Sequence, residues 1–335
     1  MLEGTICVVA GASGFLGRRL AELLQQEGAA VRALVRPSSR VVLPQSIAIV
    51  RCPLADGEAL AAALDGADIL FNCIGHSADW GAWESFHEGN IESVEHLWRA
   101  AARAGVGRIL HVSTTDVYGY PRSACDESQP LIDVGLPYNR SKIAGDRLAR
   151  GLGSELGLDV TVVRPATIFG PGSHDWVLEL GRLLQAGQVP TIRGGRTNAG
   201  LVFVDDVGYA MIELAAVSDA AGEAYNVVDP SPISWYAYLA GICEVMGARP
   251  PRVDIPEGLA LSLAFLSETV WRCLGMKRRP LFTRHAVYVM CRDQHYGAAK
   301  LCEKIARFPR VGLAQGLDTT WAWLAEQLRE RGGKL

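Results

Sequence analysis

The chain has 335 residues, which exceeds the size at which one hydrophobic core usually keeps growing, so we expect two lobes. It is 49% apolar and 21% charged, as in ordinary soluble proteins, and its net charge of −3 provides no general attraction to nucleic acid or to an anionic membrane. The eight cysteines form no Cys-x-x-Cys pair or Cys/His cluster, which indicates reduced thiols, no metal site and a cytoplasmic location.

Continuous apolar runs mark the expected strands. Residues 5–10 form such a run and end at Gly11, which is typical of a strand buried on both faces of a parallel sheet. No basic region followed by an apolar run precedes this strand, so we expect no signal peptide. In chain order, further strands are predicted at residues 30–35, 47–50, 69–74, 108–113 and 160–164, and helices at 16–28, 91–104 and 138–152.

This alternation implies βαβ units and an α/β fold with a Rossmann-type, doubly wound parallel sheet. Proline and glycine become frequent over residues 165–200, and the C-terminal part shows mostly helical patterns. We therefore place a Rossmann domain at residues 1–165, with a return segment near 201–216. A smaller, mostly helical C-terminal substrate lobe is expected at 166–200 and 217–335.

A glycine-rich loop joins the first expected strand to the first helix. Gly11, Gly14 and Gly17 have the spacing G-x-x-G-x-x-G. Missing side chains let the backbone turn tightly and approach a phosphate, and the helix start offers free N–H groups with a partial positive charge. An ordinary tight turn is the alternative, but the position in the first βαβ unit favours a dinucleotide pyrophosphate site.

The end of the second expected strand bears on the identity of the dinucleotide. An acidic residue there binds the ribose hydroxyls of NAD, whereas arginine suits the 2′-phosphate of NADP. The sequence offers Arg36, Ser38, Ser39 and Arg40 and no carboxylate. This composition favours NADP(H) over NAD(H), and the alternative is that Arg36 is only a solvated loop charge.

Tyr138 and Lys142 lie one turn apart on an expected helix and therefore share a face. A lysine ammonium and an oxidised nicotinamide ring both favour the phenolate, so the tyrosine would serve as an acid or base toward a substrate C–OH. A second hydroxyl, needed to hold the substrate oxygen, is available from the cluster Ser113-Thr114-Thr115 at the end of a strand. The Tyr-x-x-x-Lys pair alone occurs by chance in many helices, but its combination with the glycine-rich loop and the Ser/Thr cluster indicates an enzyme.

With these motifs together, the chain resembles the extended short-chain dehydrogenase/reductase family over nearly its whole length. The resemblance rests on the glycine loop and on Asn72-Cys-Ile-Gly75, Asn90, Ser113-Thr-Thr-Asp-Val-Tyr-Gly119, Pro137-Tyr-Asn-Arg-Ser-Lys142, Arg164-Pro-Ala-Thr167 and Val202-Phe-Val-Asp-Asp206. It implies Tyr138 as acid/base, Lys142 as the residue that holds the ribose and lowers the tyrosine pKa, Thr114 as the hydroxyl clamp, and a homodimer. It implies a cofactor site of Gly11, Ser13, Gly14, Phe15, Leu16, Gly17, Arg36, Ser38, Leu54, Cys73, Ile74, Gly75, Tyr138, Lys142, Pro165 and Thr167. Asn90 is expected to support local structure.

Within this family the chain is most similar to the 3β-hydroxysteroid dehydrogenase-like branch, which includes reductases of 3-oxo compounds such as 2-alkyl-3-oxoalkanoates. Residues 80–90 and the run from Pro280 to Leu324 carry this similarity. Departures are Pro53-Leu54, where the family usually has Asp-Leu beside adenine, and Phe203, where it often has histidine. Thr115-Asp116, in place of the Asp-Glu of sugar 4,6-dehydratases, argues against dehydration chemistry.

Two segments are candidates for the substrate end. His76, Trp80 and Trp83 follow the fourth expected strand and, with Thr115, are candidate substrate contacts, although a packed loop cluster explains the tryptophans equally well. Leu259, Leu263, Leu266, Val270 and Leu274 repeat at helical spacing before the basic run 277–279. A core-facing helix with a charged end is the expectation for them, and a lid that touches an apolar substrate or lipid is the alternative.

These observations indicate an NADP(H)-preferring oxidoreductase that interconverts a secondary alcohol and a ketone on an apolar or cyclic small molecule. The nearest rival is an NDP-sugar epimerase that uses the same trio and tightly bound NAD, with Arg193, Arg196 and Arg252 as candidates for the substrate pyrophosphate. A redox-sensing or scaffolding protein that binds NADPH without turnover is a third reading, which the intact Tyr/Lys/Thr set opposes.

Overall fold

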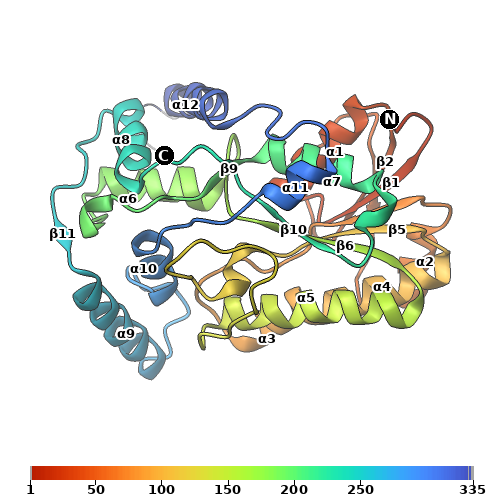
Figure 1. Ribbon diagram of the computed structural model, residues 1–335, viewed down its shortest axis with the longest axis horizontal. Coiled ribbons are helices and arrows are strands. Elements are labelled where there is room, and N and C mark those ends of the chain that lie inside the picture. The colour runs from red at the N-terminus through yellow and green to blue at the C-terminus, as the bar shows by residue number, and fades with distance from the viewer. Residues whose placement is uncertain (1, 331, 333–335) are drawn as a thin grey trace.

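A seven-stranded parallel sheet forms the centre of the computed structural model, which describes residues 2–330 and 332 (Figure 1). The order β10-β6-β5-β4-β1-β2-β3 reverses direction between β1 and β4, as in a doubly wound Rossmann-type sheet. The strands are β1 (Ile6–Ala10), β2 (Ala30–Val35), β3 (Ala48–Arg51), β4 (Ile69–Asn72), β5 (Arg108–Val112), β6 (Asp159–Pro165) and β10 (Ala224–Val227). The first six lie at the predicted positions, with ends that differ by one or two residues.

Both faces of the sheet are covered, which explains the uninterrupted apolar runs. In β1, Cys7 and Val9 point into one hydrophobic cluster, whereas Val8 and Ala10 point into another. Consecutive side chains of a strand point to opposite faces, so a strand between two layers needs apolar residues at every position. The predicted Rossmann-type fold is therefore confirmed.

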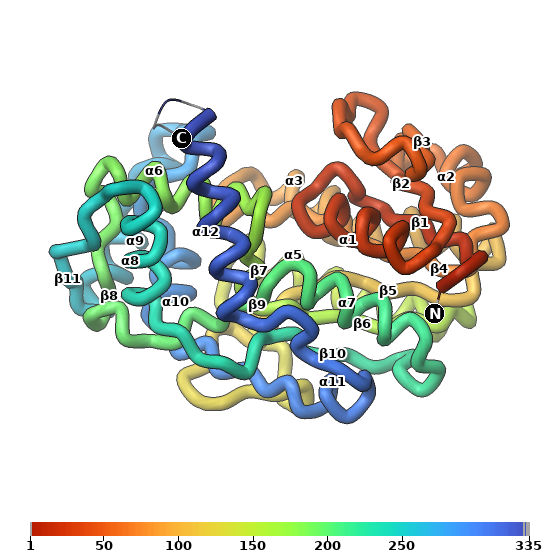
Figure 2. Tube along the Cα trace, turned by 90° about the horizontal axis from the view of Figure 1, so that it is seen from above, coloured from red at the N-terminus to blue at the C-terminus, as the bar shows by residue number. Residues whose placement is uncertain are grey.

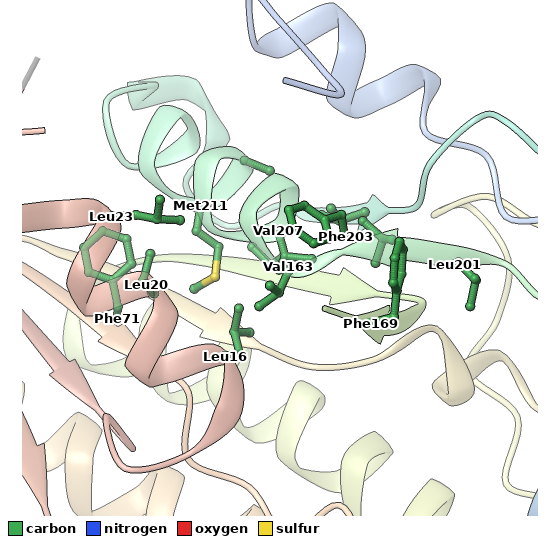
Figure 3. Close-up of a cluster of buried hydrophobic side chains, with 14 of the residues drawn as sticks. Leu16, Leu20, Leu23, Phe71, Val163, Phe169, Leu201, Phe203, Val207 and Met211 are labelled. Carbon is green, nitrogen blue, oxygen red and sulfur yellow. The ribbon is translucent and has the colours of Figure 1, made fainter. Parts of the chain in front are cut away.

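Helices α1 (Phe15–Gln26) and α7 (Val204–Ala215) cover one face of the sheet, and α2 (Gly57–Leu64), α4 (Ser93–Ala104) and α5 (Pro137–Leu156) cover the other (Figure 1). Leu16, Leu20 and Leu23 on α1 meet Val207 and Met211 on α7 above Phe71 and Val163 of the sheet (Figure 3). Leucines at i, i+4 and i+7 share one side of a helix, so the periodicity in the sequence produced this contact.

The remaining elements gather mainly beyond the carboxyl ends of the strands. Figure 2 shows α6, α8, α9 and α10 together at one end of the molecule and β1–β3 with α1 at the other. The helices are α3 (Trp83–His87), α6 (Leu180–Gln185), α8 (Trp235–Met246), α9 (Glu257–Cys273), α10 (Arg284–Cys291), α11 (Ala299–Lys304) and α12 (Leu313–Glu330). Two short sheets pair β7 (Thr167–Phe169) with β9 (Leu201–Phe203) and β8 (Thr191–Ile192) with β11 (Asp254–Ile255). Single turns lie at Glu88–Glu92, Thr115–Tyr118, His174–Glu179, Arg193–Gly195 and Ser218–Ala220.

The chain returns to the sheet over a longer stretch than residues 201–216. Helix α7 packs on the sheet as expected, but β9 pairs with β7 outside it, and β10 adds the seventh strand beside β6. No local pattern separated β10 from its surroundings, because a four-residue strand carries too little periodicity to be recognised. The proposed division into a Rossmann domain and a substrate lobe stays a prediction.

Helix α9 differs from the expectation for its apolar stripe. Leu259, Leu263, Leu266, Val270 and Leu274 are between 40% and 66% exposed, whereas Ala260 and Ala264 on the opposite side are fully buried. The prediction that this stripe faces the core is therefore wrong. The small side chains let α9 lie close to α10, and the large ones point outward. Among the described residues, no helix combines the length and the apolar composition that crossing a membrane requires.

Candidate active site

A cavity of about 800 Å³ lies between the carboxyl ends of the central strands and the C-terminal helices. Its walls combine residues at the ends of the central strands with residues of the segments 173–192 and 279–290, as expected at the switch point of a doubly wound sheet. The predicted site residues that line it are Gly14, Phe15, Leu16, Gly17, Cys73, Ile74, Gly75, His76, Thr114, Tyr138, Lys142, Pro165 and Thr167.

The glycine loop forms one wall and needs its glycines for steric reasons. Gly11 has a φ of 81°, and a Cβ on it would lie 2.8 Å from the carbonyl carbon of Cys73. A Cβ on Gly17 would collide with the carbonyl oxygen of Gly11, so this glycine permits the tight turn from β1 into α1. Side chains at these two positions would force β1, β4 and α1 apart.

The start of α1 is suited to an anionic group. Gly14 is its N-cap, and no side chain caps the helix. The first N–H groups of a helix carry a partial positive charge and lack partners within the helix, so an uncapped start beside a cavity can bind a pyrophosphate. Ser13 is exposed in the same loop. The residues present therefore fit a dinucleotide at this wall.

The ends of β2 and β3 lie beyond the cavity lining. Arg36 and Ser38 are exposed, and within the described residues Arg36 forms no ion pair. Leu54 is half-buried and packs against the cluster beneath the sheet. Arg36 is thus available to an anion at the edge where β1 and β2 end.

The loop after β4 is held in place by Asn90. The side chain of Asn90 accepts a hydrogen bond from the backbone N–H of His76 (2.8 Å) and donates to its carbonyl oxygen (3.1 Å) and to Ser141 Oγ (2.9 Å). Asn90 therefore ties Gly75 and His76, at the cavity wall, to helix α5.

Tyr138, Lys142 and Thr114 come together at the cavity. Tyr138 and Lys142 project from α5, and Thr114 lies two residues after β5, at the start of the turn Thr115–Tyr118. Thr114 lies close enough to the Tyr138 hydroxyl for its side chain to lower the pKa of the phenol. Lys142 Nζ donates to the carbonyl oxygen of Val112 (2.8 Å), which anchors the ammonium between α5 and β5. These residues meet because α5 packs against the turn Thr115–Tyr118 that follows β5.

The protein by itself does not lower the pKa of Tyr138. Burial raises this pKa, the charge of Asp116 raises it further, and the side chain of Thr114 lowers it. Burial also lowers the pKa of Lys142 to about 8, against the charge of Asp146. A phenolate at Tyr138 therefore requires positive charge in addition to what the protein alone supplies.

A buried ion pair lies one turn beyond Lys142. Asp146 receives two hydrogen bonds from Arg164 (2.9 Å each), and Arg164 Nη1 donates to the Tyr118 hydroxyl (2.9 Å). Tyr118 in turn donates to Asn226 on β10 (2.8 Å). This network fixes α5 against β6 and β10. It also holds the end of β6 in place, where Pro165, the residue after Arg164, lines the cavity.

A polar cluster from two segments, residues 116–120 and helix α10, faces Tyr138 and was not predicted. Tyr120 donates to Asp116 Oδ2 (3.3 Å), and its hydroxyl oxygen lies 2.8 Å from His285 Nδ1. The ring of His285 packs edge-on against Tyr138 at a centroid distance of 5.6 Å. Asp116 directly precedes Val117-Tyr-Gly119, but His285 comes from α10 and has no local signal in the sequence.

Trp80, Trp83 and Thr115 lie outside the cavity lining. Trp80 donates to the carbonyl oxygen of Met276 (3.3 Å) beyond the end of α9, and Trp83 is exposed at the start of α3. Thr115 is buried, only 1% exposed. Of the four predicted substrate contacts, only His76 lines the cavity, where Asp79, from the same loop, pairs with Arg279 (2.6 Å).

The arginines proposed for a substrate pyrophosphate also lie elsewhere. Arg193, Arg196 and Arg252 are exposed and do not line the cavity. The two arginines that do, Arg182 and Arg279, already pair with Glu179 (3.3 Å) and Asp79.

Comparison with known proteins relates this architecture to a large group of enzymes. Residues 7–227 match the NAD dependent epimerase/dehydratase family. A ketoreductase of 4-hydroxy-2-methyl-3-oxo-4-farnesyl-3,4-dihydroquinoline-1-oxide from Stigmatella aurantiaca is 30% identical over 92% of this chain and 94% of its own. A 3β-hydroxysteroid dehydrogenase/Δ5→4-isomerase from Mycobacterium tuberculosis is 26% identical over 92% and 88%.

Solved structures share the fold at low sequence identity. The UDP-glucuronic acid 4-epimerase from Bacillus cereus, in complex with NAD, superposes with a TM-score of 0.74. The two chains are 17% identical over 96% of this chain and 99% of the other. This similarity concerns the arrangement of helices and strands.

Proposed function

Because the chain belongs to the NAD dependent epimerase/dehydratase family, whose relatives of similar length include ketoreductases and sterol dehydrogenases, we propose that it interconverts a secondary alcohol and a ketone. The chain is an NAD(P)-dependent dehydrogenase/reductase of the extended short-chain type. The proposal adds that the substrate is an apolar or cyclic small molecule and that NADP(H) is preferred.

The observation that carries the proposal is the meeting of Tyr138, Thr114 and Lys142 at one wall of the cavity. A phenol held by a neighbouring hydroxyl can place a proton on, or take it from, a substrate oxygen. A nicotinamide dinucleotide supplies or accepts the hydride when it is bound. The glycine loop at Gly14–Gly17 would hold its pyrophosphate, and Pro165 and Thr167 would border the nicotinamide end.

Each residue of the trio has a separate task in the proposal. Tyr138 would donate a proton to the substrate oxygen or accept one from it. Thr114 would hold that oxygen beside the Tyr138 hydroxyl. Lys142 stays charged below about pH 8, because burial lowers its pKa to that value, and its ammonium would bind ribose hydroxyls and favour the phenolate. The rise in the pKa of Tyr138 caused by burial keeps the phenol protonated in the free protein, so proton transfer would depend on the complete complex.

The lining of the substrate half supports an apolar ligand. Beyond the cofactor wall the cavity is bordered mainly by aliphatic and aromatic side chains, namely Ile168, Trp176, Leu180, Leu183, Val189, Ile192, Leu281, Phe282, Val287 and Met290. Of the two arginines in the lining, Arg279 pairs with the buried Asp79 and Arg182 forms an exposed pair with Glu179, so the cavity offers little unpaired positive charge to a sugar-nucleotide pyrophosphate. This distribution favours a ketone or alcohol with little charge.

The NADP(H) preference rests on Arg36. Its guanidinium is exposed at the end of β2, Ser38 lies beside it, and the sequence has no carboxylate there. A 2′-phosphate would find a bidentate donor at this position, whereas the ribose hydroxyls of NAD would find no acidic partner.

Replacement of Tyr138 by phenylalanine tests the reaction. The expected result is a fall in kcat of about 10²- to 10⁴-fold for NADPH-dependent reduction of a panel of cyclic and long-chain ketones, because the proton donor is lost. Dinucleotide binding, measured by fluorescence titration, should change little. Tyr236→Phe, at an exposed tyrosine on α8, is the matched control. Full activity of the Tyr138 variant would contradict the proposal.

The sugar-nucleotide epimerase reading predicts a different cofactor behaviour. An epimerase must return its hydride to the substrate, so freshly purified protein would release about one equivalent of NAD on denaturation. Exchangeable NADP or an empty site would support a reductase that exchanges its dinucleotide at every turnover. A protein that binds NADPH tightly but reduces no ketone would indicate the sensing role. The homodimer and the cytoplasmic location remain parts of the proposal, and sedimentation velocity tests the first.

A further inference from the structure

The outward side of α9 presents large apolar side chains to solvent. Leu259, Leu263, Leu266, Val270 and Leu274 form this row, and we call them, with the following Lys277 and Arg278, the α9 face. Phe265, Met276 and Leu281 extend it, each more than 40% exposed. Contiguous apolar surface of this kind is rare on a protein that meets only water, and it usually marks a binding surface.

The burial of α9 is inverted relative to an ordinary surface helix. Its inner side carries the buried Ala260, Ala264 and Glu268, with Leu261 partly buried, and the two alanines pack against Val287 and Cys291 of α10. The larger residues would stabilise the fold more if they faced inward, since burial of a leucine contributes about 1.5–3 kcal/mol. Their outward position therefore points to a partner that covers them.

The charges around the α9 face have one sign. Glu257 pairs with Arg122 (2.8 Å) and Arg292 (3.0 Å). Glu268 is buried and receives hydrogen bonds from the backbone and side chain of Arg284 (2.7 and 2.8 Å). Both carboxylates of the helix are thus neutralised on its inner side, while Lys277 and Arg278 are exposed.

The α9 face continues into the rim of the cavity. Leu281 is 48% exposed and also lines the cavity, and Phe282 follows it. The segment between α9 and α10 is joined to the loop after β4 by the ion pair of Arg279 with Asp79. A partner that covers the α9 face would therefore lie next to the rim of the cavity at Leu281, where an apolar substrate would enter.

We propose that the α9 face docks on the surface of a lipid bilayer with anionic headgroups. Helix α9 lies at the outer edge of the molecule (Figure 1, dark teal), where it can lie flat on such a surface. Leucine side chains would enter the acyl boundary, and the two cations would meet the headgroups. The net charge of −3 does not oppose this contact, because attraction within a Debye length depends on the local charges. The α9 segment of a second copy would offer no free carboxylate to Lys277 and Arg278, so it fits this face less well.

Vesicle flotation with the full-length protein tests the proposal without reference to turnover. The expected result is binding to vesicles of phosphatidylglycerol and phosphatidylcholine, weaker binding to phosphatidylcholine alone, and release at high salt. Leu263→Ser together with Leu266→Ser should weaken binding at least about tenfold, because apolar burial is lost. Lys277→Glu with Arg278→Glu should weaken binding to anionic vesicles but leave binding to phosphatidylcholine vesicles unchanged.

Val42→Ser is the matched control, since Val42 is exposed on another part of the surface. It should bind like the unmodified protein, and circular dichroism should show that all variants are folded. Absence of vesicle binding, or an equal loss in the control, would overturn the proposal. Self-association that the two serine substitutions abolish, without vesicle binding, would also overturn it by identifying a second copy as the occupant. Ketone reduction measured without vesicles does not depend on vesicle binding, so failure of this proposal can be distinguished from failure of the proposed function.

Discussion

Asp146→Asn should strongly destabilise the protein, because it leaves Arg164 without a counter-charge. Both side chains of this pair are at most 2% exposed, and their two hydrogen bonds are 2.9 Å long. The asparagine keeps the shape and one acceptor oxygen, but its amide group would face a guanidinium N–H. Among the residues that the structure describes, the one further side-chain hydrogen bond of Arg164 runs to the neutral hydroxyl of Tyr118.

The expected loss is about 3–5 kcal/mol, the usual cost of removing one partner from a buried ion pair. This is a large part of the stability of a typical domain, which is about 5–15 kcal/mol. Urea unfolding followed by tryptophan fluorescence measures it. Glu95→Gln, which breaks an exposed pair with Arg99, should cost less than about 1 kcal/mol.

A double-mutant cycle separates the pair from general damage to the core. Arg164→Met removes the orphaned charge, so the double variant should be less destabilised than the sum of the single ones, with a coupling of at least about 2 kcal/mol. Additive effects, or a loss from Asp146→Asn no larger than in the Glu95 control, would refute the reasoning.

The same substitution should alter the pH dependence of the reaction. The charge of Asp146 raises the pKa of Lys142, which burial lowers to about 8. Without the carboxylate, the ammonium is less favoured and its pKa falls, so Lys142 loses its proton at a lower pH. The alkaline limb of the kcat/KM profile for ketone reduction should then move to lower pH. An unshifted limb in a folded variant would show that Lys142 does not set it.

Two further predictions concern the cofactor and the polar cluster. Arg36→Asp should weaken NADPH binding by about 10- to 100-fold, the value of a charge-assisted hydrogen bond, and should affect NADH much less; equal losses in titrations with both dinucleotides would exclude a role in selecting the phosphate. His285→Phe keeps a ring against Tyr138 but loses the contact with Tyr120, so kcat for ketone reduction should fall by about tenfold while the dinucleotide Kd stays constant. A parallel loss of dinucleotide affinity would instead indicate a general disturbance of the cavity.

The outcome at the tryptophans and at α9 shows where the sequence stops being informative. Trp80 and Trp83 follow a strand end that borders the cavity, yet Trp80 contacts the region after α9 and Trp83 faces solvent. Helical spacing established that the leucines of α9 share one side, but not that this side points outward. The direction depends on the partner helix, because α10 packs against the side of α9 that carries Ala260 and Ala264 and supplies Arg284 to the buried Glu268.

The sequence by itself determined the first six strands of the central sheet, the glycine loop and the placement of Tyr138 and Lys142 on one helix face. These features depend on contacts within one βαβ unit or one helical turn, so residue types and spacing suffice to predict them. Tertiary structure alone decided that His285 reaches Tyr138, that Asp146 binds Arg164 and that the leucines of α9 face solvent. Each of these depends on how segments far apart in the chain pack together, and local periodicity carries no information about that packing.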